Sequence, residues 1–474
     1  MPVFEKVLFP GGIHPQEGAG GKAVNGLNAI RPLDAPPRVI IPLQQHIGAP
    51  AKALVAAGDH VKVGQKIGEA GGFVSAPVHA SVSGRVYAVQ DAMLANGSMV
   101  PAVIIDNDYQ DEWVELHPSD HPETLKADEL RQIVREAGIV GLGGATFPTA
   151  VKLSPSGGKK IEKLIINGAE CEPFLTADHR LMLEKAADII DGVRLMMLAL
   201  ETDEALIGIE NNKQDAIDIL TAEAGRAGSG IKVVGLPVRY PQGGEKQLVY
   251  ALTRRQVPNG GLPLDVGVVV CNVGTVYAID QAIRTGKPLI ERVTTVGGLV
   301  NNPGNFLVRI GTPIDHLIEA CGGLQPHVRQ FIYGGPMMGM AIARFDIPVT
   351  KGCSGLVALA NAAKEPDESP CIKCGSCRFA CPMKLFPSRI DAFQRHGRLE
   401  EAEKLGVMNC IECGCCTYVC PAKRSLTQSM RTAKAGIRRK QQNEKAKKAA
   451  GEAAQKAKEA AEAEAKAAGE KEGA

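Results

Sequence analysis

Apolar and polar positions follow two different patterns along this chain. Between about residues 125 and 290, segments in which apolar residues recur every three to four positions alternate with short apolar runs of strand length. Because these runs are apolar throughout, their strands should be covered on both faces of a sheet. The region is therefore predicted to be an α/β fold. The elements expected are helix 127–138, strand 163–168, helix 178–200, strand 204–210, helix 213–224, strand 231–237, helix 244–253, strand 266–273 and helix 275–286.

Short strands with Gly at the turns are expected on both sides of this region. They occupy 38–106 before it, and 291–355 after it, where one helix is expected at 312–323. The whole chain is thus predicted to be multidomain, α/β and α+β. The parts expected are an extended Gly- and Asn-rich arm (1–30), a first β domain (31–120), the α/β domain (121–290), a second β domain (291–360), a cysteine-rich domain that begins with a polar linker (361–432) and a charged tail (433–474).

The first β domain resembles the barrel-sandwich hybrid of biotinyl and lipoyl carrier domains. The resemblance rests on the two half-repeats 58–67 and 76–86. Carrier domains present a modifiable Lys on the hairpin between the halves, whereas residues 68–75 here read GEAGGFVS and contain no Lys. The resemblance therefore implies a carrier-like fold without a carrier function.

Composition and charge narrow the possible functions. The chain has 474 residues, of which 45% are hydrophobic and 22% charged, as is usual for globular proteins. Aromatic residues make up 4%, which argues against an aromatic-rich nucleic-acid platform. The net charge is +2, but residues 434–474 carry 11 Lys and Arg against 7 Asp and Glu, so the remainder is slightly acidic. No partnership with nucleic acid is expected.

The chain contains no membrane-spanning signal. Its best apolar stretch, 266–273, is far shorter than the roughly 18 residues that a membrane helix needs. The first residues lack the basic and apolar regions of a secretory signal. A cytoplasmic location is expected, where disulfides are rare, so the 13 Cys point instead to metal.

Eight of the 13 Cys form two copies of the pattern C-x2-C-x2-C-x3-C-P. This spacing is typical of bacterial ferredoxins with two [4Fe–4S] clusters, in which the fourth Cys of each copy binds the other cluster. Paired zinc sites would need two separated Cys pairs rather than three ligands in one loop. The predicted ligands are Cys371, Cys374, Cys377 and Cys420 for cluster one, and Cys381, Cys410, Cys413 and Cys416 for cluster two.

The other five Cys are not expected to bind iron. Cys415 stands beside Cys416 and leaves open a shift of the ligand assignment by one position. The four isolated residues are expected to be packed as small apolar side chains. They are Cys171, Cys271, Cys321 and Cys353.

A glycine-rich loop at 141–149, GLGGATFPT, follows the first helix of the α/β region. Loops without side chains let backbone N–H groups approach a phosphate or a flat ring, although many such loops only turn the chain. The Walker pattern is absent, and so is the Rossmann glycine fingerprint in its usual strand-to-helix setting. Hydrolytic motifs such as H-E-x-x-H and a Ser-His-Asp arrangement are also missing.

Four segments together resemble the flavin-binding subunit of respiratory complex I and, more closely, the RnfC subunit of the Rnf (Rsx) electron-transport complexes. They are 141–152, 166–180, 240–248 and 271–275. The resemblance implies a Rossmann-like domain that binds FMN and NADH, followed by a small β-grasp-like domain of the SLBB type. It implies cofactor contacts at Gly141, Gly143, Gly144, Lys152, Asn167, Glu170, Tyr240, Gly243, Asn272 and Thr275, and catalytic roles for Glu172, Glu245 and Phe147, the last stacking on the nucleotide.

Some positions depart from the complex I pattern. Ala169, Gly244 and Gly274 stand where that pattern carries acids, and Leu153 stands where it carries an aromatic residue. Judged by residue type alone, Lys152 is also compatible with a solvated lysine, and Glu172 and Glu245 with surface carboxylates.

The expected function joins these sites. Nicotinamide gives up two electrons as a hydride, an iron–sulfur cluster takes one at a time, and a flavin can handle both. The resemblance implies a peripheral subunit on the cytoplasmic face of the bacterial inner membrane. It would exchange hydride with NAD(H) through FMN and relay electrons within a complex that couples ferredoxin and NAD(H) chemistry to ion movement. Integral membrane and ferredoxin-like subunits are the implied partners.

Two other functions are compatible with the same modules. One is a soluble flavin and iron–sulfur reductase of the cobalamin-reductase type, and the other is an electron-relay scaffold without flavin. The basic part of the tail, 434–448, is expected to be a solvated, fraying helix or disordered, because Ile437 is its one large apolar residue. Contact with anionic lipid or with an acidic partner subunit is the alternative.

Overall fold

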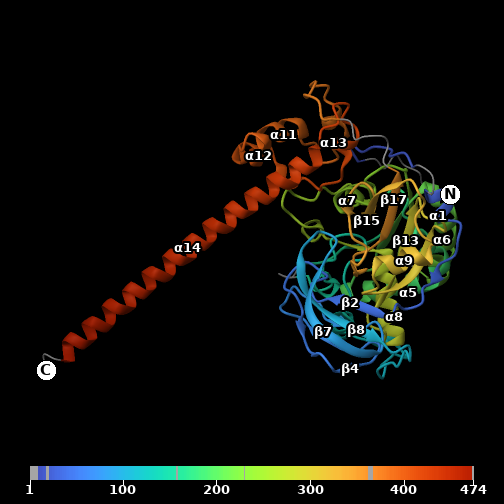
Figure 1. Cartoon of the computed structure of the whole chain (residues 1–474), viewed down its shortest axis with the longest axis horizontal. Helices are drawn as coiled ribbons and strands as arrows, with labels where there is room; N and C mark the ends of the chain where they lie inside the picture. Colours follow the sequence, from blue (N-terminus) through green and yellow to red (C-terminus); the bar gives the residue numbers. More distant parts are fainter. Residues whose placement is uncertain (1–8, 18–20, 156–158, 229, 361–366, 472–474) are drawn as a thin grey trace. The chain divides into compact units, whose positions relative to one another are not determined.

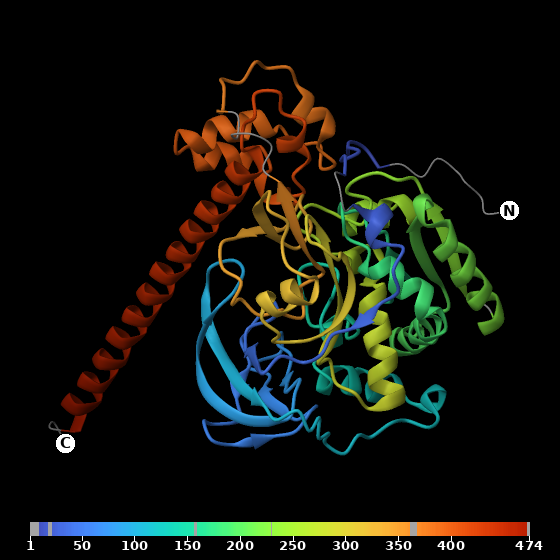
Figure 2. The same cartoon turned by 45° about the vertical axis from the view of Figure 1, so that its right-hand side comes forward.

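The computed structural model describes residues 9–17, 21–155, 159–228, 230–360 and 367–471. They belong to two compact units, residues 1–366 and residues 367–474, which are treated separately below. Figures 1 and 2 show the chain in two views.

The first β domain of unit one is a sandwich of two small antiparallel sheets (Figure 1). Their inward side chains, among them Val39, Ile67 and Val103, form one core. The barrel-sandwich hybrid is therefore confirmed, and the hairpin at residues 70–77 contains no Lys. The strands are β2 (Arg38–Pro42), β8 (Met99–Asn107), β7 (Gly84–Met93) and β4 (His60–Val61) in one sheet, and β3 (Lys52–Ala53), β5 (Lys66–Glu69) and β6 (Val78–His79) in the other.

The α/β domain contains a four-stranded parallel sheet in the order β11-β10-β9-β12. Alternate side chains of its strands enter two separate cores, with Ile166 on one face and Ile165 on the other, so both faces are covered as predicted. The elements are α2 (Ala127–Glu136), α3 (Thr149–Lys152), β9 (Lys163–Gly168), α4 (Ala177–Glu184), α5 (Ala186–Leu200), β10 (Ala205–Glu210), α6 (Gln214–Ala227), β11 (Ile231–Leu236), α7 (Glu245–Thr253), β12 (Val268–Asn272) and α8 (Val273–Thr285).

The expected helix 178–200 is wrong in one respect, because the structure has two helices there. Lys185 leaves the helical conformation, with φ −131° and ψ 32°, and separates α4 from α5. The apolar spacing continues through the break, so the sequence pattern carries no sign of it.

The strand order creates a switch point between β9 and β12. From β9 the chain proceeds to β10 and β11 on one side, and β12 is then added on the other side of β9. In open α/β sheets, ligands bind outside the carboxyl ends of the strands at such a point. Asn167 and Asn272 lie opposite each other in the register of β9 and β12 at these ends.

The second β domain is built on a six-stranded mixed sheet with one helix, α9 (Ile314–Ala320), in its core. Its edge strand directly follows the N-terminal arm, and the arm itself forms a short helix, α1 (Lys22–Asn25), before that strand. In order the strands are β1 (Arg31–Pro32), β14 (Gly304–Arg309), β13 (Glu291–Gly298), β17 (Gly355–Ala360), β15 (Val328–Tyr333) and β16 (Met340–Ile342).

Unit two is a small helical domain around the cysteine motifs. Its elements are α10 (Ser376–Ala380), α11 (Pro387–Arg395), α12 (Leu399–Lys404), α13 (Cys415–Tyr418) and α14 (Leu426–Lys471). Buried Asp391 accepts hydrogen bonds from Arg395, Arg424 and Ser429, which ties α11 to the start of α14.

The expectation that the tail has no buried side chain is wrong for its first turns. Ile437 is 2% exposed and packs with Ile390 and Ala433 in the core of unit two. Helix α14 also runs through the expected domain boundary at residue 433. Among the described helices, none has both the length and the apolar run required to cross a membrane.

Candidate functional site

Two asparagines organise the carboxyl edge of the parallel sheet in unit one. Asn167 Nδ2 donates to the carbonyl oxygen of Gly243 at 2.8 Å, which fixes the turn before α7 against the end of β9. Asn272 caps α8: its Oδ1 accepts from Gly274 N at 2.9 Å, and its Nδ2 donates to Asp178 Oδ2 at 2.6 Å. Each asparagine therefore connects two of the predicted segments.

The glycine loop lies next to this edge. Leu142 N donates to the hydroxyl of buried Thr275 at 2.9 Å, and Gly141 N donates to Phe147 O at 2.9 Å. A Cβ on Gly143 would lie 2.8 Å from the Asn272 side chain, so the backbone approaches closer than any side chain would allow. Gly143 and Gly144 are exposed, and nothing lies within 4 Å of where a Cβ of Gly144 would be. The loop thus presents bare backbone to solvent.

Lys152 and Glu245 form a partly buried ion pair beside the loop. Lys152 Nζ lies 3.2 Å from Glu245 Oε1 and donates to Val270 O at 3.0 Å. Burial alone would lower the pKa of Lys152, but the charge of Glu245, the nearby Cys271 and the hydrogen bond to Glu245 together outweigh burial, and the pKa of Lys152 is raised. The lysine is therefore a fixed cation rather than a solvated one.

Glu172 and Tyr240 form the second polar pair of the site. Tyr240 OH donates to Glu172 Oε1 at 3.3 Å, and Met337 N donates to Glu172 Oε2 at 3.0 Å. Burial raises the pKa of Glu172 to about 7, although the hydrogen bond from Met337 opposes the shift. Glu172 is thus a half-buried carboxyl whose surroundings raise its pKa, not a surface carboxylate.

Glu170 has a different position. Its carboxylate accepts from Asp178 N at 3.0 Å and from His179 N at 3.2 Å and so caps the first turn of α4. The carboxylate that was predicted to contact the cofactor therefore binds the N-terminal end of α4 instead. Glu170 affects the site by holding α4 in place.

Sequence reasoning missed two ionisable residues of the site, half-buried Asp178 and buried Arg292. Burial, followed by the charge of Glu170, raises the pKa of Asp178 to about 7. The guanidinium of Arg292 donates to Leu142 O at 3.3 Å and to Lys351 O at 2.5 Å, and it thereby connects the glycine loop to the backbone at Lys351. Asp178 falls inside the recognised segment 166–180 and could have been singled out, whereas Arg292 lies in an ordinary strand pattern.

These features fit a flavin mononucleotide. Exposed loop backbone, the N-terminus of α8 and the cation Lys152 are suited to a phosphate. The amides of Asn167 and Asn272 stand at the switch point, where α/β sheets bind their ligands.

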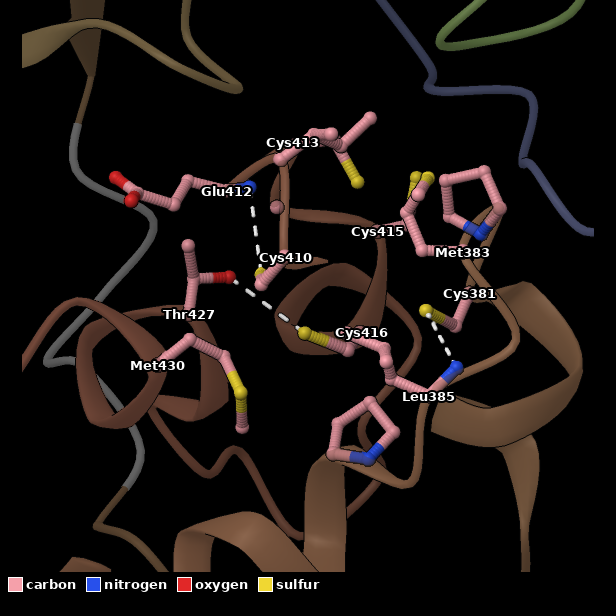
Figure 3. Close-up of a pocket in the computed structure, with 14 residues that line it drawn as sticks. Cys381, Met383, Leu385, Cys410, Glu412, Cys413, Cys415, Cys416, Thr427 and Met430 are labelled. Atoms are coloured by element: carbon pink, nitrogen blue, oxygen red, sulfur yellow. Dashed lines mark hydrogen bonds between the residues drawn. The ribbon is translucent and has the colours of Figure 1, made fainter. Parts of the chain in front are cut away.

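The four Cys predicted to bind cluster two line one hollow in unit two (Figure 3). Leu385 N donates to Cys381 Sγ at 3.4 Å, Glu412 N donates to Cys410 Sγ at 3.4 Å, and Cys416 Sγ lies 3.7 Å from the Thr427 hydroxyl. Donors of this kind stabilise cluster-bound thiolates. Within the described residues, no three His, Cys, Asp or Glu side chains converge as for a single metal ion. A cubane instead takes one thiolate at each of four irons.

The cluster-one Cys are less enclosed. Cys371 and Cys374 are exposed, Cys377 is buried and Cys420 is half-buried. Cys377 packs with Leu426 of α14 and with Cys416, and Cys420 lies against the same group. Two residues of the second motif therefore lie near the first motif, and the crossed ligand pattern stays a prediction.

The remaining Cys differ among themselves. Cys415 is fully buried and lines the cluster-two hollow together with the predicted ligands. Cys271, Cys321 and Cys353 are buried, as expected of small apolar side chains. The Cys171 thiol accepts from Gly243 N at 3.3 Å, so it helps to fix the turn that also binds Asn167.

Four domain families match successive parts of the chain. They are the RnfC barrel sandwich hybrid domain at residues 7–110, the Nuo51 FMN-binding domain at 134–281, the SLBB domain at 293–341 and the 4Fe-4S dicluster domain at 364–421. The NAD⁺-reducing [NiFe]-hydrogenase in its H₂-reduced state is a similar solved structure, with TM-score 0.48, 19% identity and coverage of 66% of this chain and 65% of that chain.

Relatives match nearly the whole chain. The C subunit of the proton-translocating ferredoxin:NAD(+) oxidoreductase complex of Clostridium ljungdahlii is 47% identical, over 93% of this chain and 96% of that protein. The C subunit of the Na(+)-translocating complex of Acetobacterium woodii is 46% identical, over 90% and 97%. The C subunit of the ion-translocating oxidoreductase complex of Rhodobacter capsulatus is 44% identical, over 91% and 83%. With its barrel-sandwich, FMN-binding, SLBB and dicluster domains in that order, the chain belongs to the RnfC family of subunits of the ion-translocating Rnf oxidoreductase complexes.

Proposed function

We propose that this chain is the NAD(H)-reactive subunit of an ion-translocating ferredoxin:NAD⁺ oxidoreductase. The observation that carries the proposal is its 47% identity, over 93% of its length, to the C subunit of such a complex. The polar edge of the parallel sheet and the Cys-lined hollow give the chain the two kinds of site that this activity needs. None of these findings favours a soluble cobalamin-reductase activity or a scaffold without flavin.

In this proposal FMN binds at the carboxyl edge of β9 and β12. When bound, it exchanges a hydride for two single electrons. Gly141, Gly143 and Gly144 offer their backbone, Asn167 and Asn272 offer amides, and Thr275 and Gly243 fix the turns. Lys152 keeps its positive charge because Glu245 faces it, and so can stabilise either the phosphate or the reduced ring.

The nicotinamide side is assigned to Glu172, Tyr240, Glu245 and Phe147. With a pKa of about 7, Glu172 holds a proton on its carboxyl for part of the time at neutral pH, next to the Tyr240 hydroxyl. Phe147 is half-buried at the end of the glycine loop, where a ring can stack on a nucleotide. Glu170 serves indirectly, through α4.

The ligand sets proposed for the two clusters are the crossed sets predicted from spacing. Cys371, Cys374, Cys377 and Cys420 hold cluster one, and Cys381, Cys410, Cys413 and Cys416 hold cluster two. Backbone donors to Cys381 and Cys410 stabilise their thiolates and so favour the reduced cluster.

We also propose the location, partners and domain limits inferred from sequence. The subunit would be peripheral, on the cytoplasmic face of the bacterial inner membrane, held by integral membrane and ferredoxin-like subunits. The domain limits are placed at residues 30, 120, 290, 360 and 432, with α14 continuing from the cluster domain into the tail.

The test is to purify the full chain without oxygen and to measure its FMN and iron. One FMN and about eight iron atoms per chain are expected. NADH should then bleach the visible absorbance of both flavin and clusters. Protein with full iron but no FMN, and with no response to NADH, would be a relay scaffold and would refute the proposal.

A further inference from the structure

The N-terminal arm is bound to the flavin side of unit one by a set of specific contacts. Its described residues are 9–17 and 21–30, and α1 lies against this unit in both overall views (Figures 1 and 2). The contacts concentrate on two places, the turn that follows Glu170 and the backbone of Tyr240. These are the segments that carry the Glu172 and Tyr240 pair.

The arm satisfies both backbone polar groups of Phe174. Glu17 Oε1 accepts from Phe174 N at 3.1 Å, and Asn25 Nδ2 donates to Phe174 O at 2.8 Å. Phe174 has a φ of +69°, a conformation that bulky residues rarely adopt and that persists only when the surroundings impose it. Glu172 stands two residues earlier, so holding Phe174 also holds the backbone of Glu172.

The arm also forms hydrogen bonds with both backbone polar groups of Tyr240. Ile13 N donates to Tyr240 O at 2.8 Å, and Tyr240 N donates to Ile13 O at 2.9 Å. A Cβ on Gly12, whose φ is +84°, would lie 2.8 Å from Tyr240 O, so only Gly permits this approach. The backbone that carries the Tyr240 hydroxyl is therefore set by the arm.

A third contact brings a charge. Lys22 Nζ donates to the main-chain oxygen of Glu170, and Lys213 Nζ donates to the same oxygen at 3.3 Å. Two lysine side chains therefore donate to the carbonyl oxygen of Glu170 and hold the start of the turn that follows it. Lys213 belongs to the α/β domain and also pairs with buried Glu210. Of the two lysines, Lys22 is the one that the arm contributes.

We propose that the arm is a positioning element of the flavin site, a clasp formed by Gly12, Ile13, Glu17, Lys22 and Asn25 that sets the distance between the Glu172 carboxyl and the Tyr240 hydroxyl. These five residues act through the backbones that carry the two side chains. The clasp rests on the proposed function, since it concerns the same flavin and nicotinamide site.

Two variants of the full chain test the clasp by opposite means. Asn25→Ala removes the donor to Phe174 O, and Gly12→Ala adds a methyl group against Tyr240 O. Leu27→Ala, in the same arm but 78% exposed, is the matched control. The rate at which FMN leaves the diluted protein, followed by flavin fluorescence, should rise about 10-fold in Asn25→Ala, as expected when one buried polar group loses its partner. It should rise in Gly12→Ala as well, because the added methyl group pushes the backbone of Tyr240 away from the arm. KM for NADH should rise with kcat nearly unchanged, and hydrogen exchange should quicken in 167–176 and 240–245.

The outcomes separate the clasp from simple stabilisation. If both test variants lower the melting temperature but release FMN at the wild-type rate, with unchanged KM, the arm only stabilises the fold and the clasp is refuted. If wild-type protein binds no FMN, the proposed function itself fails. Should Asn25→Ala not fold, Gly12→Ala, which deletes no side-chain contact, still decides the matter. Leu27→Ala must match wild type throughout.

Discussion

At the scale of single residues, the site depends on side chains whose charge is set by burial and by one close partner. Glu172 is largely buried against Tyr240 and Met337, whereas Glu245 is half exposed and faces Lys152. Two carboxyls of the same type therefore have different surroundings: burial raises the pKa of Glu172 to about 7, whereas Glu245 pairs with the charge of Lys152.

The raised pKa of Glu172 predicts a pH dependence of stability. A carboxyl that titrates near 7 when folded and near 4.5 when unfolded binds more protons in the folded state, so its contribution to stability falls as pH rises between these values. Glu172→Gln should remove this dependence and raise the free energy of unfolding of unit one at pH 8 by up to about 3 kcal/mol. Denaturant unfolding at pH 5 and pH 8 measures it. Equal gains at both pH values would contradict the assignment.

The fixed charge of Lys152 predicts weaker FMN binding when it is removed. Lys152→Met keeps the length of the side chain but loses a charge-assisted donor, which should raise the dissociation constant of FMN about 10- to 100-fold. Lys159→Met is the control, because Lys159 pairs with Asp265 at the surface. Fluorescence titration of both variants with FMN compares them. Equal affinity in the two variants would place Lys152 outside the site.

At the scale of secondary structure, α14 has two parts with different roles. Its first turns build unit two: Thr427 meets Cys416, Lys434 Nζ donates to Cys410 O at 2.9 Å, and Ile437 enters the core. From residue 438 to the last described side chains, the helix is exposed and rich in Lys, Glu and Ala. The first part should support cluster two, and the second should be dispensable for it.

Two truncations test this division. A chain that stops after Gln442 should keep about eight iron atoms, whereas one that stops after Arg431 loses Lys434 and Ile437 and should keep about four. Iron analysis and the electron paramagnetic resonance signal of the reduced clusters distinguish them. The first truncation also tests the lipid-binding alternative, since unchanged membrane retention would exclude a role for residues 443–474 in it.

Sequence predicted the elements well where packing is local, and it singled out candidate site residues where motifs mark them. Strands such as β9 and β12 are visible because burial on both faces requires continuous apolar residues. Asn167 and Asn272 were found through their segments. Arg292 was not, because its partners are backbone carbonyls of residues 142 and 351, which carry no side-chain signature. The arm looked featureless for the same reason, since most of its contacts with unit one are made to backbone groups.

At the scale of the whole molecule, the proposed flavin site and the proposed cluster ligands belong to separate units. Every residue assigned to FMN lies in residues 1–366, and all eight proposed cluster ligands lie in residues 367–474. Neither ligand set borrows a side chain from the other unit. Binding of each cofactor should therefore be independent, while electron transfer from NADH to the clusters should require both.

Removing each cofactor in turn tests this independence. Full-length protein stripped of FMN should keep its iron and its bleaching by dithionite, but lose bleaching of the clusters by NADH, and added FMN should restore it.

In Cys413→Ser, which lacks one proposed ligand of cluster two, FMN content and the reduction of flavin by NADH should remain as in wild type, while iron falls. Cys415→Ser is the matched control and should retain full iron, since Cys415 lines the same hollow without being a proposed ligand. If iron falls in Cys415→Ser and not in Cys416→Ser, the ligand assignment must shift by one position. If FMN is lost whenever iron is lost, the two sites are not independent, and the division of labour between the units is refuted.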